Sequence, residues 1–444
     1  MKHEYKSLWG DNIIMPSFPT LGKDENTEVL IIGGGMAGIL CAYYLKSKGI
    51  QFILCEAARV GSGTTYGTTA VISAQHDILY TDIVKSFGDV KAKKYLDANL
   101  SAVQKFRELS EHIDCDYEEK PSYMYSTNNR LKMQKETQIV NSLGFSTEFV
   151  TDISLPFDIA GGVKFPKQGQ FHPLKFLSGI CGGMKIYEHT QIYKVCDNIA
   201  YTDKYKIKAK KIIVATHFPI INTHGLYFAK LYQKRSYVIA LENASNIDGT
   251  YISDEKNGMY FRNYGNLLLI GGGDHRTGKT GGNYEEIRRF AKRFYPSSNE
   301  QYAWATQDCM SLDGIPYIGT YSHNLPNVYV ASGFNEWGMT SSMVAAKIII
   351  DKIMGKTNKY EDVFCPSRNM FKMQLLANMS TTFIDFITPT TKRCPHLGCA
   401  LKWNSVEHTW DCPCHGSRFD SNGKLIDNPA TGDLNIGKKN NKSK

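Results

Sequence analysis

The 444-residue chain has no run of about 18 consecutive apolar residues, which is the length that a transmembrane helix needs. Residues 1–20 lack the apolar core and the small-residue cleavage site of a secretory signal, so we expect a cytoplasmic protein without a transmembrane segment. No stripe of basic residues interleaved with aromatic ones is present, so nucleic acid is not an expected partner. The sequence also contains no internal repeat and no low-complexity block.

Positive charge is only modestly in excess. The formal net charge is +9, and part of it sits in a lysine-rich tail, residues 438–444. We expect this tail to be solvated and disordered. A basic surface that docks an acidic electron carrier is the alternative. The length predicts two or three domains.

Eleven cysteines are many for a cytosolic chain, and they fall into two groups. Four crowd into residues 394–414, a density that indicates a metal site or a disulfide. The other seven lie in apolar or mixed segments, where a cysteine is expected to be a small buried hydrophobe. These seven are Cys41, Cys55, Cys115, Cys181, Cys196, Cys309 and Cys365.

The first regular pattern is a β-α-β unit. Residues 28–32 form an apolar run typical of a strand, residues 36–48 have helical periodicity, and residues 51–55 form a second strand. Further along, residues 211–215 and 327–331 predict two more buried strands. The pattern predicts an α/β fold built on a Rossmann-like domain.

The turn after the first strand matches GxGxxG through Gly33, Gly35 and Gly38. The first glycine permits the tight turn, the second lets backbone approach a pyrophosphate, and the third lets the helix pack on the strand. The helix N-terminus adds N–H donors for the phosphates. Glu56, at the end of the second strand, is placed to accept ribose hydroxyls. The sequence thus predicts a dinucleotide site, with a plain β-α-β turn as the alternative.

The loop 56–69 resembles the family of FAD-dependent amine and amino-acid oxidoreductases that includes glycine and sarcosine oxidases. Segments 313–319 and 333–340 resemble the same family, and the likeness covers roughly residues 27–357. It implies FAD rather than NAD, with the loop running along the pyrophosphate towards the isoalloxazine ring. The two later segments would close over the ribityl chain and the pyrimidine edge. There Gly338, at a helix start, would direct N–H dipoles at reduced flavin.

The resemblance and the glycine turn together predict the residues that contact FAD. They are Gly33, Gly35, Gly38, Glu56, Arg59, Gly63, Thr64, Thr65, Thr69, Ile192, Ala215, Gly333, Gly338, Met339 and Thr340. Cys309 lies near the position at which some sarcosine oxidases tether flavin covalently, although the register fits poorly.

No single residue stands out as catalytic. Cationic and phenolic groups bind a carboxylate in the family's substrate domain, and His217 and His275, which follow strands and glycines, could face the flavin. A structural hydrogen bond is the better explanation of His172, and packing or surface roles would explain the other candidates. Those candidates are Arg235, Tyr237, Arg262 and His275.

Near the C-terminus, two short boxes each offer one thiolate and one imidazole. The first contains Cys394 and His396, and the second contains Cys412 and His415. The boxes resemble a Rieske centre, in which two cysteines bind one iron and two histidines the other. The resemblance implies that these four residues bind a [2Fe–2S] cluster.

The Rieske resemblance also implies a disulfide between Cys399 and Cys414 that braces the two loops. Cytosolic disulfides are rare, so this bond is a less secure inference than the four ligands. Zinc is the rival for such a ligand set. Zinc fingers usually group like ligands as C-x₂₋₄-C and H-x₃₋₅-H, whereas cysteine and histidine alternate here.

The C-terminal module departs from the Rieske pattern in two ways. Cytochrome bc-type centres carry a tyrosine near the cluster where this chain has Phe419, which removes one hydroxyl donor and should lower the reduction potential. Ser417 keeps the family serine that donates to a sulfide. In addition, too few residues precede the first box for the usual base sheet. We therefore expect a minimal β module, carried on a hairpin between the boxes and docked on the FAD domain through apolar residues of the linker: Phe371, Leu375, Leu376, Phe383 and Phe386.

The expected architecture is a Rossmann-like FAD domain, an interleaved α+β substrate domain and a small all-β C-terminal Rieske module. The FAD part comprises about residues 27–80, 186–217 and 310–357, and the substrate part about 81–185 and 218–309. The segments in chain order are an N-terminal extension (1–26), the oxidoreductase domain (27–365), a linker with one short helix (366–392), the Rieske module (393–437) and the basic tail (438–444).

The predicted function is oxidation of a small substrate, an amine or amino acid, at the flavin. Electrons would then pass one at a time through the cluster to an external carrier, because flavin accepts a pair and the cluster holds one. A reductase running in the opposite direction is one alternative. A redox sensor or electron carrier without its own substrate is the other.

Overall fold

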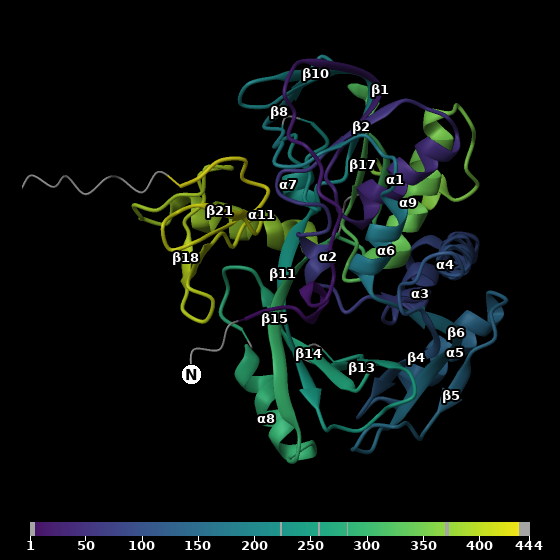
Figure 1. Cartoon of the computed structure of the whole chain (residues 1–444). Helices are drawn as coiled ribbons and strands as arrows, with labels where there is room; N and C mark the ends of the chain where they lie inside the picture. The colour runs from purple at the N-terminus through teal and green to yellow at the C-terminus, as the bar shows by residue number, and fades with distance from the viewer. Residues whose placement is uncertain (1–4, 223, 256–257, 282, 369–372, 435–444) are drawn as a thin grey trace, which may run out of the picture.

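The computed structural model describes residues 5–222, 224–255, 258–281, 283–368 and 373–434 (Figure 1). Their strands form an eight-stranded, a nine-stranded and a four-stranded sheet. The basic tail lies outside the described residues. The three sheets correspond to an FAD part, a substrate part and a C-terminal module, which is the predicted fold class.

The eight-stranded sheet is built around β1 (Glu25–Ile32), which pairs in parallel with β2 (Phe52–Cys55) and β10 (Lys206–Val214). The ends of these strands are apolar and buried, as expected for a parallel sheet covered on both faces. Its order is β16-β17-β10-β1-β2-β7, and β8 and β9 extend it from β10. The other members are β7 (Ile186–Tyr187), β8 (Lys194–Cys196), β9 (Ile199–Tyr201), β16 (Tyr317–Ser322) and β17 (Leu325–Ser332).

Two helices pack against each other beside this sheet, α1 (Met36–Ser47) and α9 (Gly338–Ile353). Most of both helices is buried, which is why their sequences are apolar on almost every side. The predicted β-α-β unit is therefore present, with boundaries that differ by one residue at the helix end and at the second strand.

The nine-stranded sheet has the order β15-β11-β14-β13-β12-β4-β6-β3, with β5 paired to β6. Its strands are β3 (Val71–Ile72), β4 (Glu118–Ser126), β5 (Glu148–Val150), β6 (Gly161–Gln170), β11 (Tyr232–Glu242), β12 (Thr250–Ser253), β13 (Tyr260–Tyr264), β14 (Leu267–Arg276) and β15 (Asn299–Met310). The remaining helices before the C-terminal module are η1 (Leu8–Gly10), α2 (Thr64–Gly67), α3 (Leu79–Phe87), α4 (Asp89–Ser110), α5 (Arg130–Ser142), α6 (Pro173–Ile180), α7 (Tyr227–Lys230), α8 (Tyr284–Phe294) and α10 (Glu361–Phe364).

Side chains of β11 alternate between the two faces of the sheet. Gln233 and Arg235 turn to the C-terminal module, where they contact His415 and Glu407. Lys234 turns to the opposite face, where it pairs with Glu336 of the loop before α9. One face of β11 therefore contacts the module and the other face contacts the loop before α9, and Figure 1 shows the module in yellow beside β11.

The C-terminal module is a four-stranded antiparallel sheet in the order β18-β19-β20-β21. Its strands are β18 (Lys402–Asn404), β19 (Thr409–Asp411), β20 (Arg418–Phe419) and β21 (Leu425–Asp427). The predicted hairpin between the boxes is present as β18–β19, with Trp403 opposite Trp410. No further strand belongs to this sheet among the described residues, so the module is as small as the sequence indicated.

The linker differs from its prediction, because most of it is one 15-residue helix, α11 (Met373–Ile387). The helix turns its polar side chains inward: Asn378 and Asp385 are buried, and Asn378 donates to the carbonyl of Ala229 at 3.1 Å. The predicted apolar docking through this segment is wrong for three residues, which are 56–66% exposed, and Phe371 lies outside the described residues. The three are Leu376, Phe383 and Phe386; Leu375 is half-buried.

Among the described residues, no helix is both long and apolar enough to cross a membrane.

Candidate functional site

The glycine turn after β1 has the close contacts that its pattern predicts. Gly33 has φ +108°, and a Cβ there would lie 2.4 Å from the carbonyl oxygen of Ala215. A Cβ on Gly38 would lie 1.9 Å from the carbonyl oxygen of Gly33, so helix α1 packs on the turn only with glycine at that position. The backbone N–H of Met36 donates to Thr65 Oγ1 at 3.1 Å, which joins the helix start to the threonine-rich loop.

Glu56 closes the turn from the end of β2. Its carboxylate accepts hydrogen bonds from the N–H groups of Gly34 at 2.6 Å and Ala58 at 2.8 Å. Burial raises the pKa of Glu56, although these backbone donors oppose that effect. The side chain is therefore fixed beside the glycine turn, which is the position that the sequence predicts.

A cavity of about 760 Å³ runs from this turn to the nine-stranded sheet. Of the residues predicted to contact FAD, those that line it are Gly33, Gly35, Glu56, Gly63, Thr64, Thr65, Thr69, Ile192, Ala215, Gly338 and Met339. The structure gives the others structural contacts. Thr340 Oγ1 donates to Ser73 O at 3.1 Å, Arg59 lies on the surface near Glu188, and Gly333 supplies a left-handed φ of +70° before α9.

The two cysteine–histidine boxes lie side by side in the C-terminal module. The imidazole rings of His396 and His415 are 4.9 Å apart between centroids, and Cys394 and Cys412 are buried free thiols. Nδ1 of His396 and both ring nitrogens of His415 are buried and without hydrogen-bond partners. Burial lowers the pKa of His396 to about 4, which keeps the ring in the neutral form that binds metal.

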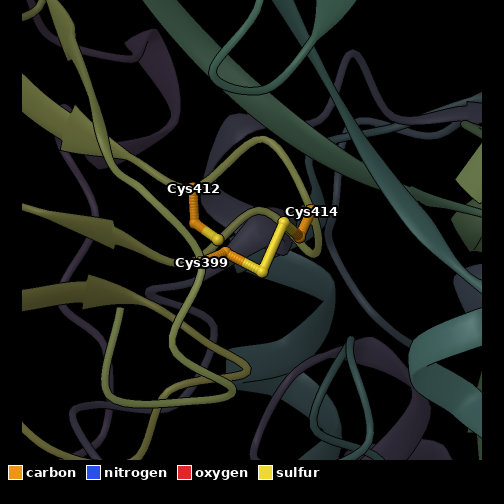
Figure 2. Close-up of side chains that lie close together, drawn as sticks. All are labelled: Cys399, Cys412 and Cys414. Carbon is orange, nitrogen blue, oxygen red and sulfur yellow. A yellow bond between two sulfur atoms is a disulfide. The ribbon is translucent and has the colours of Figure 1, made fainter. Parts of the chain in front are cut away.

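The predicted disulfide between Cys399 and Cys414 is present (Figure 2). The sulfurs of Cys399, Cys412 and Cys414 lie within 4.8 Å of one another, a spacing that would suit a shared metal ion. Two of these sulfurs are bonded to each other, however, so they are not free to coordinate. The four residues predicted as ligands have no such bond and are free to coordinate: Cys394, His396, Cys412 and His415.

Four polar side chains join the module to the rest of the chain, and we call this contact the seam: Gln233, Arg276, Gln307 and Asn428. Gln233 Nε2 donates to the carbonyl of His415 at 2.8 Å, and Gln307 Nε2 donates to that of Gly416 at 2.9 Å. Arg276 donates to the carbonyls of Pro413 and Cys414, both at 2.9 Å. Asn428 donates to the carbonyls of Thr216 and Phe218. Side chains of the nine-stranded sheet therefore hold the second box by hydrogen bonds to its backbone carbonyls.

His217 connects the seam to the threonine-rich loop, residues 56–69. Its Nδ1 lies 3.3 Å from Thr64 Oγ1, and its Nε2 lies 3.1 Å from Gln233 Oε1. It lines the cavity, as the sequence suggested it could. The side chain of His217 thus lies at the cavity wall and also contacts Gln233, which bonds to the second cysteine–histidine box.

Arg235 and Tyr237 were candidates for binding a substrate carboxylate, but the structure gives both a partner within the chain. The guanidinium of Arg235 pairs with Glu407, at the tip of the β18–β19 hairpin, and the hydroxyl of Tyr237 lies 3.4 Å from the same carboxylate. Glu407 also pairs with Arg418 at 2.8 Å. Burial alone would raise the pKa of Glu407, but the two arginines outweigh it and hold that pKa to about 2.

The remaining candidates fall in different places. Arg262 lines the cavity and donates to the carbonyls of Thr69 and Ala70, while one of its terminal nitrogens stays buried without a partner. His275 packs on Tyr237, outside the cavity lining. His172 caps α6, where its ring accepts from Lys175 N, which is the structural role expected. Burial raises the pKa of the Cys309 thiol to about 12, so it stays protonated beside the cavity.

Sequence reasoning missed Gln233, Gln307, Asn428 and Glu407. The first two are buried glutamines inside strands, and such positions usually carry apolar side chains. Each stands beside other polar residues, Lys234 in β11 and Asp308 in β15, so no hydropathy pattern marked them. Asn428 and Glu407 lie in loops of the module and gave no signal either.

Comparison with known families fits this geometry. The model of the FAD dependent oxidoreductase family matches residues 28–352. The chain belongs to this family. The Rieske [2Fe-2S] domain model matches residues 386–437. The oxidoreductase therefore uses FAD and a [2Fe–2S] cluster. The glycine turn, the cavity and the unpartnered imidazole nitrogens fit these two groups.

Relatives share one or both parts of the oxidoreductase. The Rieske 2Fe-2S iron-sulfur protein YhfW of Bacillus subtilis is 33% identical over 97% of each chain. Gamma-glutamylputrescine oxidoreductase of Escherichia coli is 24% identical over 78% of this chain and 87% of its own length. Glycine oxidase from Geobacillus kaustophilus has a similar fold, with a TM-score of 0.65 and 18% identity over 78% of this chain and 99% of its own.

Proposed function

We propose that the oxidoreductase removes two electrons from a small amine or amino acid and passes them singly, through the Rieske cluster, to an external one-electron carrier. The observation that carries this proposal is the position of the two histidines beside the FAD part. The imidazole side of the two boxes faces the FAD part, where His396 Nε2 lies 2.8 Å from Asn222 Oδ1 and both rings pack on Phe218. The cluster would therefore lie close to the flavin without any domain movement.

Bound FAD would accept a hydride from the carbon next to nitrogen, leaving an imine and a proton, and would return the electrons one at a time. The chain's own residues have three tasks. The glycine turn and Glu56 hold the nucleotide end. Gln233, Gln307 and Arg276 fix the second cluster box against the sheet. Residues Leu425–Asn428, Ala430 and Thr431 of the module line the cavity and cover it from one side.

The shape of the cavity supports an enzyme rather than a redox sensor. Beyond the predicted flavin contacts, it continues along the nine-stranded sheet and is lined there by Thr250, Tyr260 and Leu269. A carrier without a substrate needs no such extension. In support of amines or amino acids, the relative from Escherichia coli acts by its name on gamma-glutamylputrescine, and the similar fold from Geobacillus kaustophilus is a glycine oxidase.

The test is an anaerobic rapid-mixing experiment on the protein with both cofactors loaded. Candidate amines and amino acids are mixed with the oxidised protein, while flavin absorbance and the cluster's paramagnetic signal are followed separately. We expect flavin to bleach first and the reduced-cluster signal to grow at the rate at which flavin reoxidises. Flavin that stays reduced while the cluster stays oxidised would contradict the proposed route.

A further inference from the structure

A half-buried group of charges borders the cavity on the flavin side of β11. Lys234 Nζ lies 2.9 Å from Asp274 Oδ2 and 2.8 Å from Glu336 Oε1. Asp308 is directly opposite Lys234 on the neighbouring strand β15. Asp308 and Glu336 both line the cavity. The group therefore presents carboxylates to whatever occupies this part of the cavity.

The group lacks positive charge. One ammonium serves three carboxylates, and Asp77 lies close enough to add a fourth to the same field. Asp308 forms no hydrogen bond or ion pair with the part of the chain that the structure describes. Burial, with the negative charge of Glu336 second, raises the pKa of Asp308 to about 8. A cation in the cavity would relieve this repulsion and restore the ionised carboxylate.

A neighbouring group also lacks a partner. The hydroxyl of Thr306, two residues before Asp308 on the same face of β15, lines the cavity and has no hydrogen-bond partner, although the residue is more than 90% buried. The rings of Tyr260 and Trp337 line it as well, and aromatic faces attract cations at short range. Unpartnered buried polar groups cost free energy, so their presence points to a polar ligand.

Two of the three arginines that line the cavity are engaged, because Arg235 and Arg418 share the carboxylate of Glu407. Arg262 gives Nε and Nη1 to backbone carbonyls and keeps Nη2 free. Arg262 lies on β13, however, three strands away from Asp308 on β15. A carboxylate on the same carbon as a nitrogen held at Asp308 would therefore meet that acid and no free guanidinium.

Building on the proposed function, we propose that Asp308, backed by Glu336, binds the protonated nitrogen of the substrate. Asp308 then accepts the extra proton, because the hydride leaves only from the neutral amine. The substrate class is amines that carry no carboxylate on the carbon being oxidised, rather than α-amino acids. Asp308 acts as a specificity-determining residue through its charge, and Thr306 supplies a hydrogen bond to the ligand.

The test compares the loaded wild-type protein with Asp308→Asn, which keeps the size of the side chain and removes its charge. The probe is tetramethylammonium, which has no lone pair for the flavin to oxidise, and its binding is followed by the shift in oxidised flavin absorbance. We expect the dissociation constant to rise about 10- to 100-fold in Asp308→Asn, the usual effect of losing a charged contact. Asp248→Asn, an 80% exposed acid, is the matched control and should leave binding unchanged.

A second arm measures anaerobic flavin bleaching by propylamine and putrescine, and by glycine and proline. Bleaching by the amines alone, weakened in Asp308→Asn, supports the inference. Bleaching by the amino acids, with no effect of Asp308→Asn, overturns it while leaving the proposed oxidation intact. If no compound bleaches the flavin, the proposed oxidation fails, and the tetramethylammonium titration still decides whether Asp308 binds cations. If Asp308→Asn loses FAD, Glu336→Gln replaces it in both arms.

Discussion

At the scale of single residues, Glu407 stands out because one carboxylate serves two arginines from different parts of the chain. Arg235 comes from the nine-stranded sheet and Arg418 from the module itself. Removing one member of a buried ion pair leaves charge uncompensated and usually costs about 3–5 kcal/mol. Glu407 therefore contributes to the docking of the module more than its position in a hairpin loop suggests.

The stabilisation by Glu407 should depend on pH. Its pKa is about 2 in the folded protein, below the value of about 4.3 for an unperturbed glutamate. The contribution is therefore complete above pH 5 and is lost as the pH falls towards 2. We expect Glu407→Gln to lower the unfolding free energy by about 3 kcal/mol at pH 7 and by much less at pH 3. Denaturant titrations at both pH values check this, and an equal deficit at both would contradict it.

Phe419 gives a second prediction at this scale. It is fully buried in the small core of the module, together with the cluster cysteines. Phe419→Tyr would place a hydroxyl near the cluster, where it stabilises the more negative, reduced state. We expect the reduction potential of the cluster to rise. Voltammetry of both proteins measures it, and an unchanged or lower potential would show that the hydroxyl does not reach the sulfur environment.

At the scale of elements, the turn between β1 and α1 allows a clean test of the nucleotide site. A Cβ on Gly35 would meet only Thr65 Oγ1, at 3.4 Å, so a larger side chain is tolerated by the fold but projects towards the cavity. We expect Gly35→Val to fold, to keep its iron and to lose FAD. Flavin and iron content per chain are the measurements. Gly182→Val, at a position with open space, is the control, and stoichiometric flavin in Gly35→Val would show that the pyrophosphate lies elsewhere.

The elements also show what the sequence could and could not predict. The β-α-β unit and the β18–β19 hairpin follow from local periodicity, and both are present. Helix α11 and the two faces of β11 do not follow from it, because tertiary contacts decide which face of an element is buried. In α11 the buried side is polar, since Asn378 contacts Ala229 and Arg276. Hydrophobicity alone therefore pointed to the wrong face.

The candidate site divides in the same way. The two cysteine–histidine boxes lie side by side and most of the predicted FAD contacts line the cavity, and short motifs are enough to single out both sets. The sequence could not show the neighbours of Asp308 and His217. Strand pairing alone brings Lys234 opposite Asp308, and the loop before β11 brings His217 to Gln233.

At the scale of the whole molecule, the seam makes the module dependent on the rest of the chain. Its four-stranded sheet is small, and its second box is held by side chains of β11, β14 and β15. We expect the fragment 369–444, reconstituted with iron and sulfide, not to unfold cooperatively at the temperature of the intact protein. Thermal unfolding of both, followed by circular dichroism, is the measurement. Equal midpoints would show that the module is autonomous.

The β11–β15 pair also has a kinetic consequence. Lys234 and Asp308 lie on its cavity face, whereas Gln233 and Gln307 contact the module, so a carrier that docks on the outer side of the module does not pass through the space that the substrate fills. The two half-reactions can then overlap in time, and neither reactant excludes the other. In steady-state kinetics, high concentrations of the carrier should not inhibit competitively with the substrate, and high concentrations of the substrate should not inhibit competitively with the carrier.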